Sequence, residues 1–274
     1  MRRLVIRPGA IGDFIVSLPA IECLRGGYLE VWARRPNVPL ARAAGPARAI
    51  EETGLDLLGI GPPDPRLIAA LRGFDSIVSW YGANRPEFRA STASLGLPFT
   101  FFAALPPGGT GVHAVDFHLR QARELAPCAS GGLPRIACPG LRGGFAVIHP
   151  FASAAAKRWP LDRFRDLACV LERRMPVSWC AGPEDELPGA VRIPDLYRLA
   201  CWLARARLYI GNDSGISHLA AAVGTPVVAL FGPTDPAVWA PRGPLVRVVS
   251  KTSMDAISPE DVLAALGDCG PPVS

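Results

Sequence analysis

Residues 208–236, LYIGNDSGISHLAAAVGTPVVALFGPTDP, restrict the fold more than any other stretch of the chain. Two apolar runs, 207–212 and 226–231, have the length of buried strands. Between them, 214–223 has helical character and stops at Gly224. Two strands joined through a helix are typical of a parallel sheet. The stretch therefore predicts an α/β fold.

The same alternation of strand and helix patterns runs along the whole chain. Strands are expected near 3–7, 28–33, 75–80, 99–102, 145–149, 176–180, 207–212 and 226–231, and helices near 13–25, 38–44, 64–72, 116–126, 160–174, 195–206, 214–223 and 258–266. Segment 127–144 is rich in Gly and Pro and is typical of a connection between domains. We therefore expect one domain over 1–140, a second over 145–255, and a closing helix and tail over 256–274 that packs back toward the first domain.

The composition is that of a globular protein, with 49% hydrophobic and 19% charged residues. No apolar run approaches the ~20 residues of a membrane span, and the N-terminus turns polar by Arg7, so we expect neither a membrane helix nor a signal peptide. The seven cysteines stand singly, without CxxC pairs or metal-ligand spacing. We expect free thiols in a reducing cytoplasm and no metal site.

The net charge of +5 belongs wholly to the first half of the chain. Residues 1–144 hold 16 arginines against 11 acidic residues, whereas 13 of each sign balance in 145–274. An anionic partner of the first half is therefore plausible, although an Arg-rich composition alone could give the same excess. No basic run is interleaved with aromatic residues, so we expect no nucleic-acid partner.

Ser214 and Gly215 open the expected helix at 214–223, directly after a buried strand. The first amides of a helix lack partners within it, and the positive end of its dipole attracts anions. The stretch therefore predicts a phosphate or diphosphate site, to which His218, one turn further on, could add a donor. An ordinary strand–helix turn with a packed histidine is the alternative.

Two further loops follow expected strands of the second half. Lys157, in VIHPFASAAAKRWPLDRF, is one of only two lysines beside 27 arginines. A compact ammonium there suits a phosphate oxygen, although a solvated loop lysine is the plain alternative. Glu184 and Asp185, in WCAGPEDEL, could accept hydrogen bonds from ribose hydroxyls, or could simply lead into the next helix.

The first half opens in the same way, with the strand 3–7 followed by RPGAIGD. Gly9 and Gly12 let the backbone bend and allow a substrate to come close. Asp13 then stands at the start of a helix, either as a cap or as a carboxylate for chemistry. RPGAIGD does not supply the G-x-G-x-x-G of a dinucleotide-dependent oxidoreductase.

Three segments together resemble the signature regions of the heptosyltransferases, glycosyltransferase family 9. They are GAIGDFIVSLPAI, HPFASAAAKRWP and GNDSGISHLAAAVGTPVVALFGPTDP, in the family's order. HAVDFHLRQARELA, 113–126, is also similar to a helix late in that family's first domain. The resemblance covers both halves, although the first half is shorter than is usual in the family.

The resemblance implies a GT-B fold: two facing Rossmann-like domains with an interdomain cleft, the acceptor in the first and the nucleotide sugar in the second. The implied reaction is inverting transfer of a heptose from ADP-L-glycero-β-D-manno-heptose to a lipopolysaccharide inner-core acceptor. The family's base falls on Asp13, in an acceptor-side loop with Gly9 and Gly12. Its donor-binding residues fall on Ser153, Lys157, Glu184 or Asp185, Asp213, Ser214, Gly215 and His218, with Lys157 assigned to catalysis and Asp213 expected near heptose hydroxyls.

No obligatory metal is expected, because Lys157 and the helix start at Ser214 would hold the charge of the departing diphosphate. Arginine forks, for which Arg7, Arg85 and Arg89 are candidates, would bind the anionic core. The resemblance thus implies a cytoplasmic enzyme with peripheral contact at the inner membrane surface. Two alternatives remain: a GT-B transferase using another nucleotide sugar on a different envelope glycan, and a non-catalytic nucleotide-sugar-binding relative.

Overall fold

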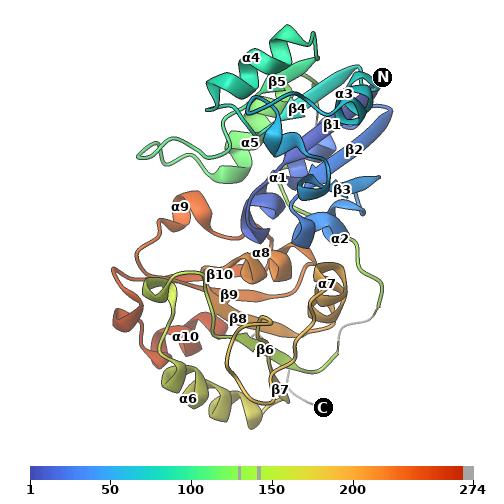
Figure 1. The fold of residues 1–274 in the computed structure, drawn as a ribbon. Helices are drawn as coiled ribbons and strands as arrows, with labels where there is room; N and C mark the ends of the chain where they lie inside the picture. Colours follow the sequence, from blue (N-terminus) through green and yellow to red (C-terminus); the bar gives the residue numbers. More distant parts are fainter. Residues whose placement is uncertain (129–130, 141–142, 268–274) are drawn as a thin grey trace. The chain divides into compact units, whose positions relative to one another are not determined.

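The computed structural model describes residues 1–128, 131–140 and 143–267. The chain divides between Gly132 and Leu133 into two compact units (Figure 1). Each unit contains one five-stranded sheet whose strands are all parallel. The predicted α/β class with two Rossmann-like halves is therefore confirmed.

The boundary between the units differs from the expected one at 140–145. Residues after Gly132 already pack on the second unit: the amide of Ile136 donates to the carbonyl of Ala222 over 2.9 Å. The hydroxyl of Tyr197 likewise donates to the carbonyl of Ala137 over 3.1 Å. These contacts attach the second part of the Gly/Pro-rich connection to the second unit.

The sheet of the first unit has the strand order β3-β2-β1-β4-β5. Its elements, in chain order, are β1 Arg2–Arg7, α1 Ile11–Cys23, β2 Tyr28–Ala33, α2 Val38–Ala41, β3 Ala47–Ala49, α3 Pro65–Arg72, β4 Ser76–Ser79, α4 Pro86–Ser94, β5 Phe99–Phe101 and α5 Ala114–Arg123. Leu4 and Ile6 of β1 face a core that includes Leu67 of α3 and Phe88 of α4. Because side chains alternate along a strand, Arg3, Val5 and Arg7 lie on the opposite face. Helices α1 and α5 pack together.

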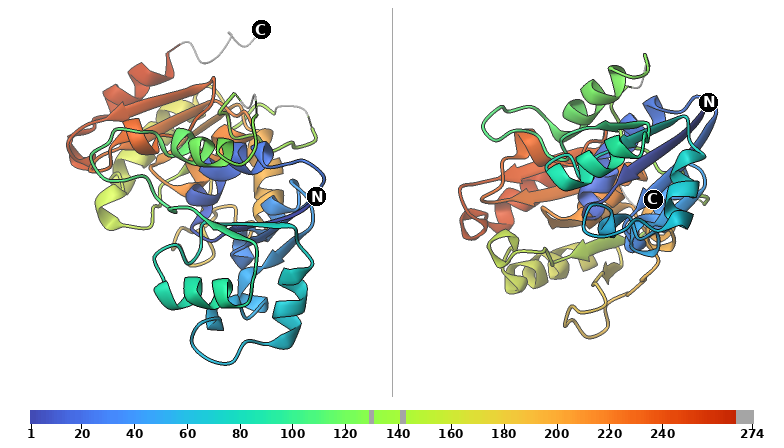
Figure 2. Two further views of the ribbon diagram at one scale, coloured as in Figure 1. Left: turned by 90° about the horizontal axis from the view of Figure 1, so that it is seen from above. Right: turned by 45° about the horizontal axis from the view of Figure 1, so that its top comes forward.

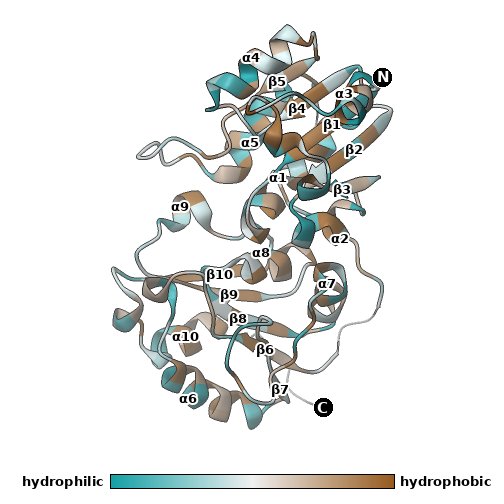
Figure 3. Cartoon of the chain, viewed as in Figure 1, coloured by the Kyte–Doolittle hydropathy of each residue, from teal (hydrophilic) through white to brown (hydrophobic). Residues whose placement is uncertain are grey.

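The sheet of the second unit has the order β10-β9-β8-β6-β7. Its elements are β6 Ala146–His149, α6 Leu161–Glu172, β7 Val177–Trp179, α7 Leu196–Ala204, β8 Leu208–Asn212, α8 Gly215–Ala222, β9 Val227–Phe231, α9 Pro236–Trp239, β10 Val246–Ser250 and α10 Pro259–Leu266. Figure 2 gives two further views of these elements. Hydrophobic residues colour the strands of both sheets, whereas α4 and α6 also carry hydrophilic residues (Figure 3). Each sheet is thus covered by amphipathic helices.

The closing segment belongs to the second unit rather than standing apart from it. Val262 and Leu266 of α10 are buried in the core formed with α6 and the strands. The side chain of Ser258 caps the helix by accepting from the amide of Asp261 over 3.1 Å. Up to residue 267 the closing segment therefore packs within the second unit, and its expected packing toward the first domain stays a prediction. Residues 268–274 lie outside the described residues.

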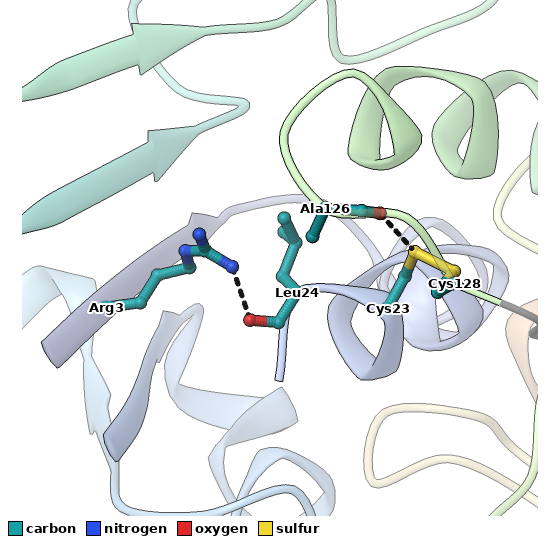
Figure 4. The surroundings of a disulfide bond; sticks show 5 residues. All are labelled: Arg3, Cys23, Leu24, Ala126 and Cys128. Carbon is teal, nitrogen blue, oxygen red and sulfur yellow. Dashed lines mark hydrogen bonds between the residues drawn. A yellow bond between two sulfur atoms is a disulfide. The ribbon is translucent and has the colours of Figure 1, made fainter. Parts of the chain in front are cut away.

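Two of the seven cysteines do not match the expectation of free thiols. Cys23, the last residue of α1, forms a disulfide with Cys128, which follows α5 (Figure 4). The bond ties the ends of two helices that already pack side by side. Cys138, Cys169, Cys180 and Cys201 are free, and Cys269 lies outside the described residues. The prediction of seven free thiols was wrong because a bridge between residues 105 positions apart leaves no local spacing signal.

Within the described ranges, no helix combines the length and apolar character needed to cross a bilayer.

Candidate active site

Each sheet has one place where the strand order reverses, and the predicted site residues gather at these two places. In the first unit the reversal lies between β1 and β4, and in the second between β6 and β8. Loops leaving neighbouring strands in opposite directions open a crevice there, where ligands bind in parallel α/β sheets. Asp13 follows β1, Lys157 follows β6, and Asp213 follows β8.

The turn before Asp13 depends on a glycine at position 9. Gly9 has φ +126°, and a Cβ at this position would lie 2.8 Å from the Cβ of Asp13. Its carbonyl accepts from the side chain of Asn37 over 3.1 Å. Gly12 lies in the first turn of α1. Gly9 therefore allows the chain to fold back closely over Asp13.

The Asp13 carboxylate serves partly as a cap. Its Oδ2 accepts from the amide of Ala10, the residue before α1, over 3.0 Å. Its Oδ1 has no hydrogen-bond partner within the described part of the chain, and the residue is half-buried. One oxygen thus fixes the side chain at the helix start, and the other remains available to accept a proton.

Of the three arginines considered for anion binding, Arg7 does not suit the role. Its side chain is only 1% exposed, so it cannot act as a solvated fork for a large anion. Arg85 is half-buried and donates to the hydroxyl of Tyr81 and to the carbonyl of Asp56. Arg89 is exposed, with its guanidinium carbon 5.6 Å from the ring centre of Phe101. Arg85 and Arg89 remain accessible.

In the second unit, Asn212 joins the loops that follow β6 and β8. Its Nδ2 donates to the carbonyl of Pro150 over 2.9 Å, and its Oδ1 accepts from the amide of Trp159 over 3.1 Å. Trp159 is itself buried and donates through Nε1 to the carbonyl of Ile257. The loop carrying Lys157 is thus held at both ends against the end of β8.

This arrangement brings the predicted Lys157 and Asp213 into contact. Lys157 Nζ lies 2.7 Å from Asp213 Oδ2. The side chain of Lys157 is 30% exposed and that of Asp213 is 9% exposed. The lysine therefore remains within reach of solvent while its charge is balanced by a nearly buried carboxylate.

Helix α8 starts directly beside this ion pair in sequence. Ser214 caps it, with Oγ accepting from the amide of Ser217 over 3.4 Å. Ser214, Gly215 and Ile216 are partly exposed, whereas Ser217 and His218 are buried. The amides of Gly215 and Ile216 precede the hydrogen bonds of the helix itself. The predicted anion site is therefore open at these residues, and His218 is a packed residue of the helix.

Polar groups at the end of β8 and the start of α8 are closely packed against one another. Tyr209 Oη lies 3.2 Å from Ser217 Oγ, and Ser217 Oγ donates to the carbonyl of Asn212. A Cβ at Gly211 would approach Tyr209 Oη to 2.5 Å, so the strand end admits no side chain there. Burial raises the pKa of Tyr209, which keeps its hydroxyl protonated as a donor.

The remaining residues predicted to bind the nucleotide sugar differ in how firmly their side chains are held. Ser153 is exposed in the loop after β6. Glu184 is exposed, whereas Asp185 is half-buried and accepts from the amide of Gly182 over 2.8 Å. Of the two carboxylates, Asp185 is thus the one fixed in its turn.

His149, the last residue of β6, was not predicted as a site residue. It pairs with Gly211 in the sheet and is 5% exposed. Its Nδ1 is buried without a hydrogen-bond partner among the described residues. Burial lowers its pKa to about 4, against a smaller opposing effect of Asp185. A neutral histidine therefore stands beside the strand that leads to Asp213.

In the described ranges, no group of three or more His, Cys, Asp or Glu side chains is arranged to hold a metal ion.

The chain belongs to glycosyltransferase family 9 (heptosyltransferase), whose model matches residues 115–261. This segment contains Lys157, Asp213 and the start of α8. The lipopolysaccharide heptosyltransferase 3 of Escherichia coli is 43% identical over a segment that covers 46% of this chain and 43% of that protein. The chain thus matches less than half the length of this curated relative.

Two solved structures share the fold over nearly the whole chain. E. coli ADP-heptose lps heptosyltransferase II has a TM-score of 0.74 at 20% identity, with 98% of both chains covered. E. coli heptosyltransferase WaaC with ADP has a TM-score of 0.71 at 16% identity, covering 98% of this chain and 100% of that one. These likenesses confirm the predicted GT-B fold class.

Proposed function

We propose that this protein is an inverting glycosyltransferase that moves a heptose from ADP-L-glycero-β-D-manno-heptose to a lipopolysaccharide inner-core acceptor. The observation that carries the proposal is the meeting of Lys157, Asp213 and the open start of α8 at one strand-order reversal. An ammonium and unbonded amides at one place suit a diphosphate leaving group. The names of the two solved relatives include ADP-heptose and ADP, which supports the same donor class.

The donor occupies the second unit in this proposal. The diphosphate lies at the amides of Gly215 and Ile216 with Ser214 Oγ beside it, and Lys157 exchanges its bond to Asp213 for a phosphate oxygen. Asp213 is then free to accept from a heptose hydroxyl. Asp185, already held by the amide of Gly182, accepts from the ribose. Ser153 belongs to the loop that carries Lys157, and His218 belongs to α8, so both lie on the elements that hold the donor in this proposal.

Asp13 acts as the base in the first unit. It takes the proton of the acceptor hydroxyl as that oxygen attacks the anomeric carbon and the carbon–diphosphate bond breaks, so the configuration inverts. Oδ1 receives the proton, while Oδ2 keeps its bond to the amide of Ala10. Gly9 and Gly12 leave room for the acceptor beside this turn.

The accessible Arg85 and Arg89 are proposed to bind anionic groups of the core acceptor, because guanidinium forks bind carboxylates and phosphates. We propose that the reaction takes place in the cytoplasm at the inner face of the inner membrane, with peripheral contact only. No metal is required in this scheme, because Lys157 and the start of α8 balance the diphosphate charge. Transfer that persists in excess chelator would support this step, and transfer restored only by a divalent cation would contradict it.

The base is tested with Asp13→Asn and Asp13→Ala. Asparagine retains an oxygen for the amide of Ala10 but cannot take the proton. Because general-base catalysis typically contributes about 10²–10⁴-fold, Asp13→Asn should lose transfer by that factor while ADP binding in calorimetry is unchanged. Transfer is measured by mass spectrometry of the acceptor. Normal turnover in Asp13→Asn would remove Asp13 from the mechanism.

The donor is tested with a panel of nucleotide sugars in the same assay. Selective turnover of ADP-heptose supports the proposal, and turnover of a UDP-hexose would indicate a transferase of another envelope glycan. Binding of ADP-heptose without modification of any core acceptor would favour a non-catalytic binding protein.

A further inference from the structure

Arg7, the last residue of β1, is a buried cation directly behind the Asp13 turn. Its Nη2 donates to the carbonyl of Asp13 over 2.8 Å, and its Nη1 donates to the carbonyl of Pro8 over 3.2 Å. These two carbonyls stand at the two ends of the turn. Arg7 makes no ion pair within the described residues, and its Nε is buried without a partner. The guanidinium thus holds the turn through backbone atoms.

Uncharged side chains, beginning with His118 of α5, hold the guanidinium of Arg7 in place. Arg7 Nη2 lies 3.3 Å from His118 Nε2, and because arginine only donates, this ring nitrogen is the acceptor. His118 Nδ1 must then carry the proton, and it faces Gln121 Oε1 at 3.4 Å. Gln121 Oε1 also accepts from Trp80 Nε1 over 2.7 Å. Burial and the charge of Arg7 lower the pKa of His118 to about 3, so the histidine is a permanent acceptor and not a competing base.

Arg3 provides a comparison on the same face of the same strand. It is also buried, and its Nη1 donates to the carbonyl of Leu24, at the other end of α1 (Figure 4). A cation at a helix C-terminus is stabilised by the helix dipole, whereas a cation at the N-terminus is opposed by it. Arg3 therefore stands where α1 favours a cation, and Arg7 where α1 disfavours one.

A buried cation in an unfavourable place calls for a compensating interaction. The only acidic residue in the first turn of α1 is Asp13. Burial lowers the pKa of Arg7 to about 10, while the charge of Asp13 opposes that effect. Arg7 is therefore protonated at neutral pH and lies close enough to Asp13 for the two charges to attract.

We propose that Arg7 is a positioning residue for Asp13, held by His118, that fixes the turn and keeps a positive charge behind the carboxylate. This rests on the proposed role of Asp13 as base. In this proposal the guanidinium acts through the Asp13 turn of the first unit, whereas the nucleotide sugar is assigned to the second unit. Its loss should therefore affect the rate of the chemical step and leave donor binding intact.

The experiment compares Arg7→Met with Arg3→Met, which remove the two buried guanidinium groups from one face of β1. Arg7→Met should lower kcat about 10- to 100-fold, with the KM for ADP-heptose within about twofold of the native value. Arg3→Met should lower the melting temperature at least as much as Arg7→Met does, and should leave kcat within about twofold of the native value. Arg7→Lys, which keeps a charge but loses the fork, should recover part of kcat. If Arg7→Met does not fold, Arg7→Lys alone decides the proposal, by a lowered kcat at native KM.

Amide hydrogen exchange gives a readout that does not depend on activity. Exchange at residues 9–14 should rise in Arg7→Met and stay native in Arg3→Met. A native kcat in Arg7→Met or Arg7→Lys, or an equal loss of kcat in Arg3→Met, would overturn the positioning role. If Asp13→Asn were fully active, the base assignment would fail as well, whereas inactive Asp13→Asn beside fully active Arg7→Met would overturn the Arg7 proposal alone.

Discussion

Lys157 Nζ and Asp213 Oδ2 lie 2.7 Å apart, although 56 residues separate them in the sequence. The pair is partly buried and lies at the strand-order reversal of the second sheet. A bound diphosphate would compete with Asp213 for the lysine. Under the proposed function, the affinity for ADP should therefore depend on both members of the pair, in opposite directions.

Lys157→Met should weaken ADP binding by about tenfold or more, equivalent to about 1.4 kcal/mol, because the ammonium no longer balances the phosphate charge. Asp213→Asn should bind ADP at least as tightly as the native protein, because the competing carboxylate is gone, while transfer falls. Calorimetry with ADP measures both variants. Lys251→Met is the matched control, since the other lysine makes an ion pair with Asp261. Equal losses of ADP affinity in the two lysine variants would contradict this prediction.

Two histidines should make stability depend on pH. Burial lowers the pKa of His149 to about 4 and that of His118 to about 3, from an ordinary 6.5. The unfolded chain therefore binds more protons below pH 6.5, so stability is fully present above that pH and is lost as the pH falls toward 4. Each histidine should contribute a slope of about 1.4 kcal/mol per pH unit in this window. Urea unfolding of native protein and His149→Gln between pH 7.5 and 5 measures the difference. If the unfolding free energies of the two proteins changed with pH in parallel, His149 would not contribute to the pH dependence of stability.

Gly9→Ala should destabilise the first unit by about 1–3 kcal/mol and reduce transfer. The backbone at Gly9 has φ +126°, and the added Cβ would stand 2.8 Å from Asp13 Cβ. Gly26→Ala is the control, because its Cβ would meet nothing within 4 Å and its φ is not in the left-handed region. Thermal unfolding and the transferase assay decide between them. Equal behaviour of the two variants would show that the turn tolerates a side chain.

Cys23→Ser should lower the free energy of unfolding of the first unit by about 4–5 kcal/mol in the chain-entropy model of a bridge that closes about a hundred residues. The disulfide spans 105 positions. Reduction of the native protein should reproduce the loss, and Cys169→Ser, at an exposed free thiol, should not. Urea unfolding with and without reductant measures the effect. An unchanged midpoint on reduction would show that the bond adds no stability.

The fold was largely predictable because its strands are apolar and its helices begin at recognisable turns. All of the expected strands are present: β2 has the expected ends, and the others have at least one end shifted by a residue. Strands β3 and β10 and helices α4 and α9 were missed. Strand β3 is only three residues, ARA, without an apolar run, and α4 buries only Phe88 and Thr92. Such elements depend on neighbours in space more than on their own pattern.

The sequence could indicate candidate residues where a polar side chain comes soon after a strand: Asp213 directly after β8, and Asp13 and Lys157 within eight residues of the ends of β1 and β6. The site was not predictable where partners are distant. Arg7 reads as a solvated residue at a strand end, yet its partner His118 lies 111 positions away. Asn212 stands within the predicted loop, but its bonds to Pro150 and Trp159 appear only in the folded structure. Long-range pairing of this kind leaves no periodic signal in one sequence.

The bridge from Cys23 to Cys128 turns most of the first unit into a covalent ring. A protease that cuts the backbone once inside this ring, for example in the exposed stretch 61–66, would release no fragment until a reductant opened the bond. On a gel without reductant, such nicked protein would migrate as an intact chain, and thiol treatment would split it in two.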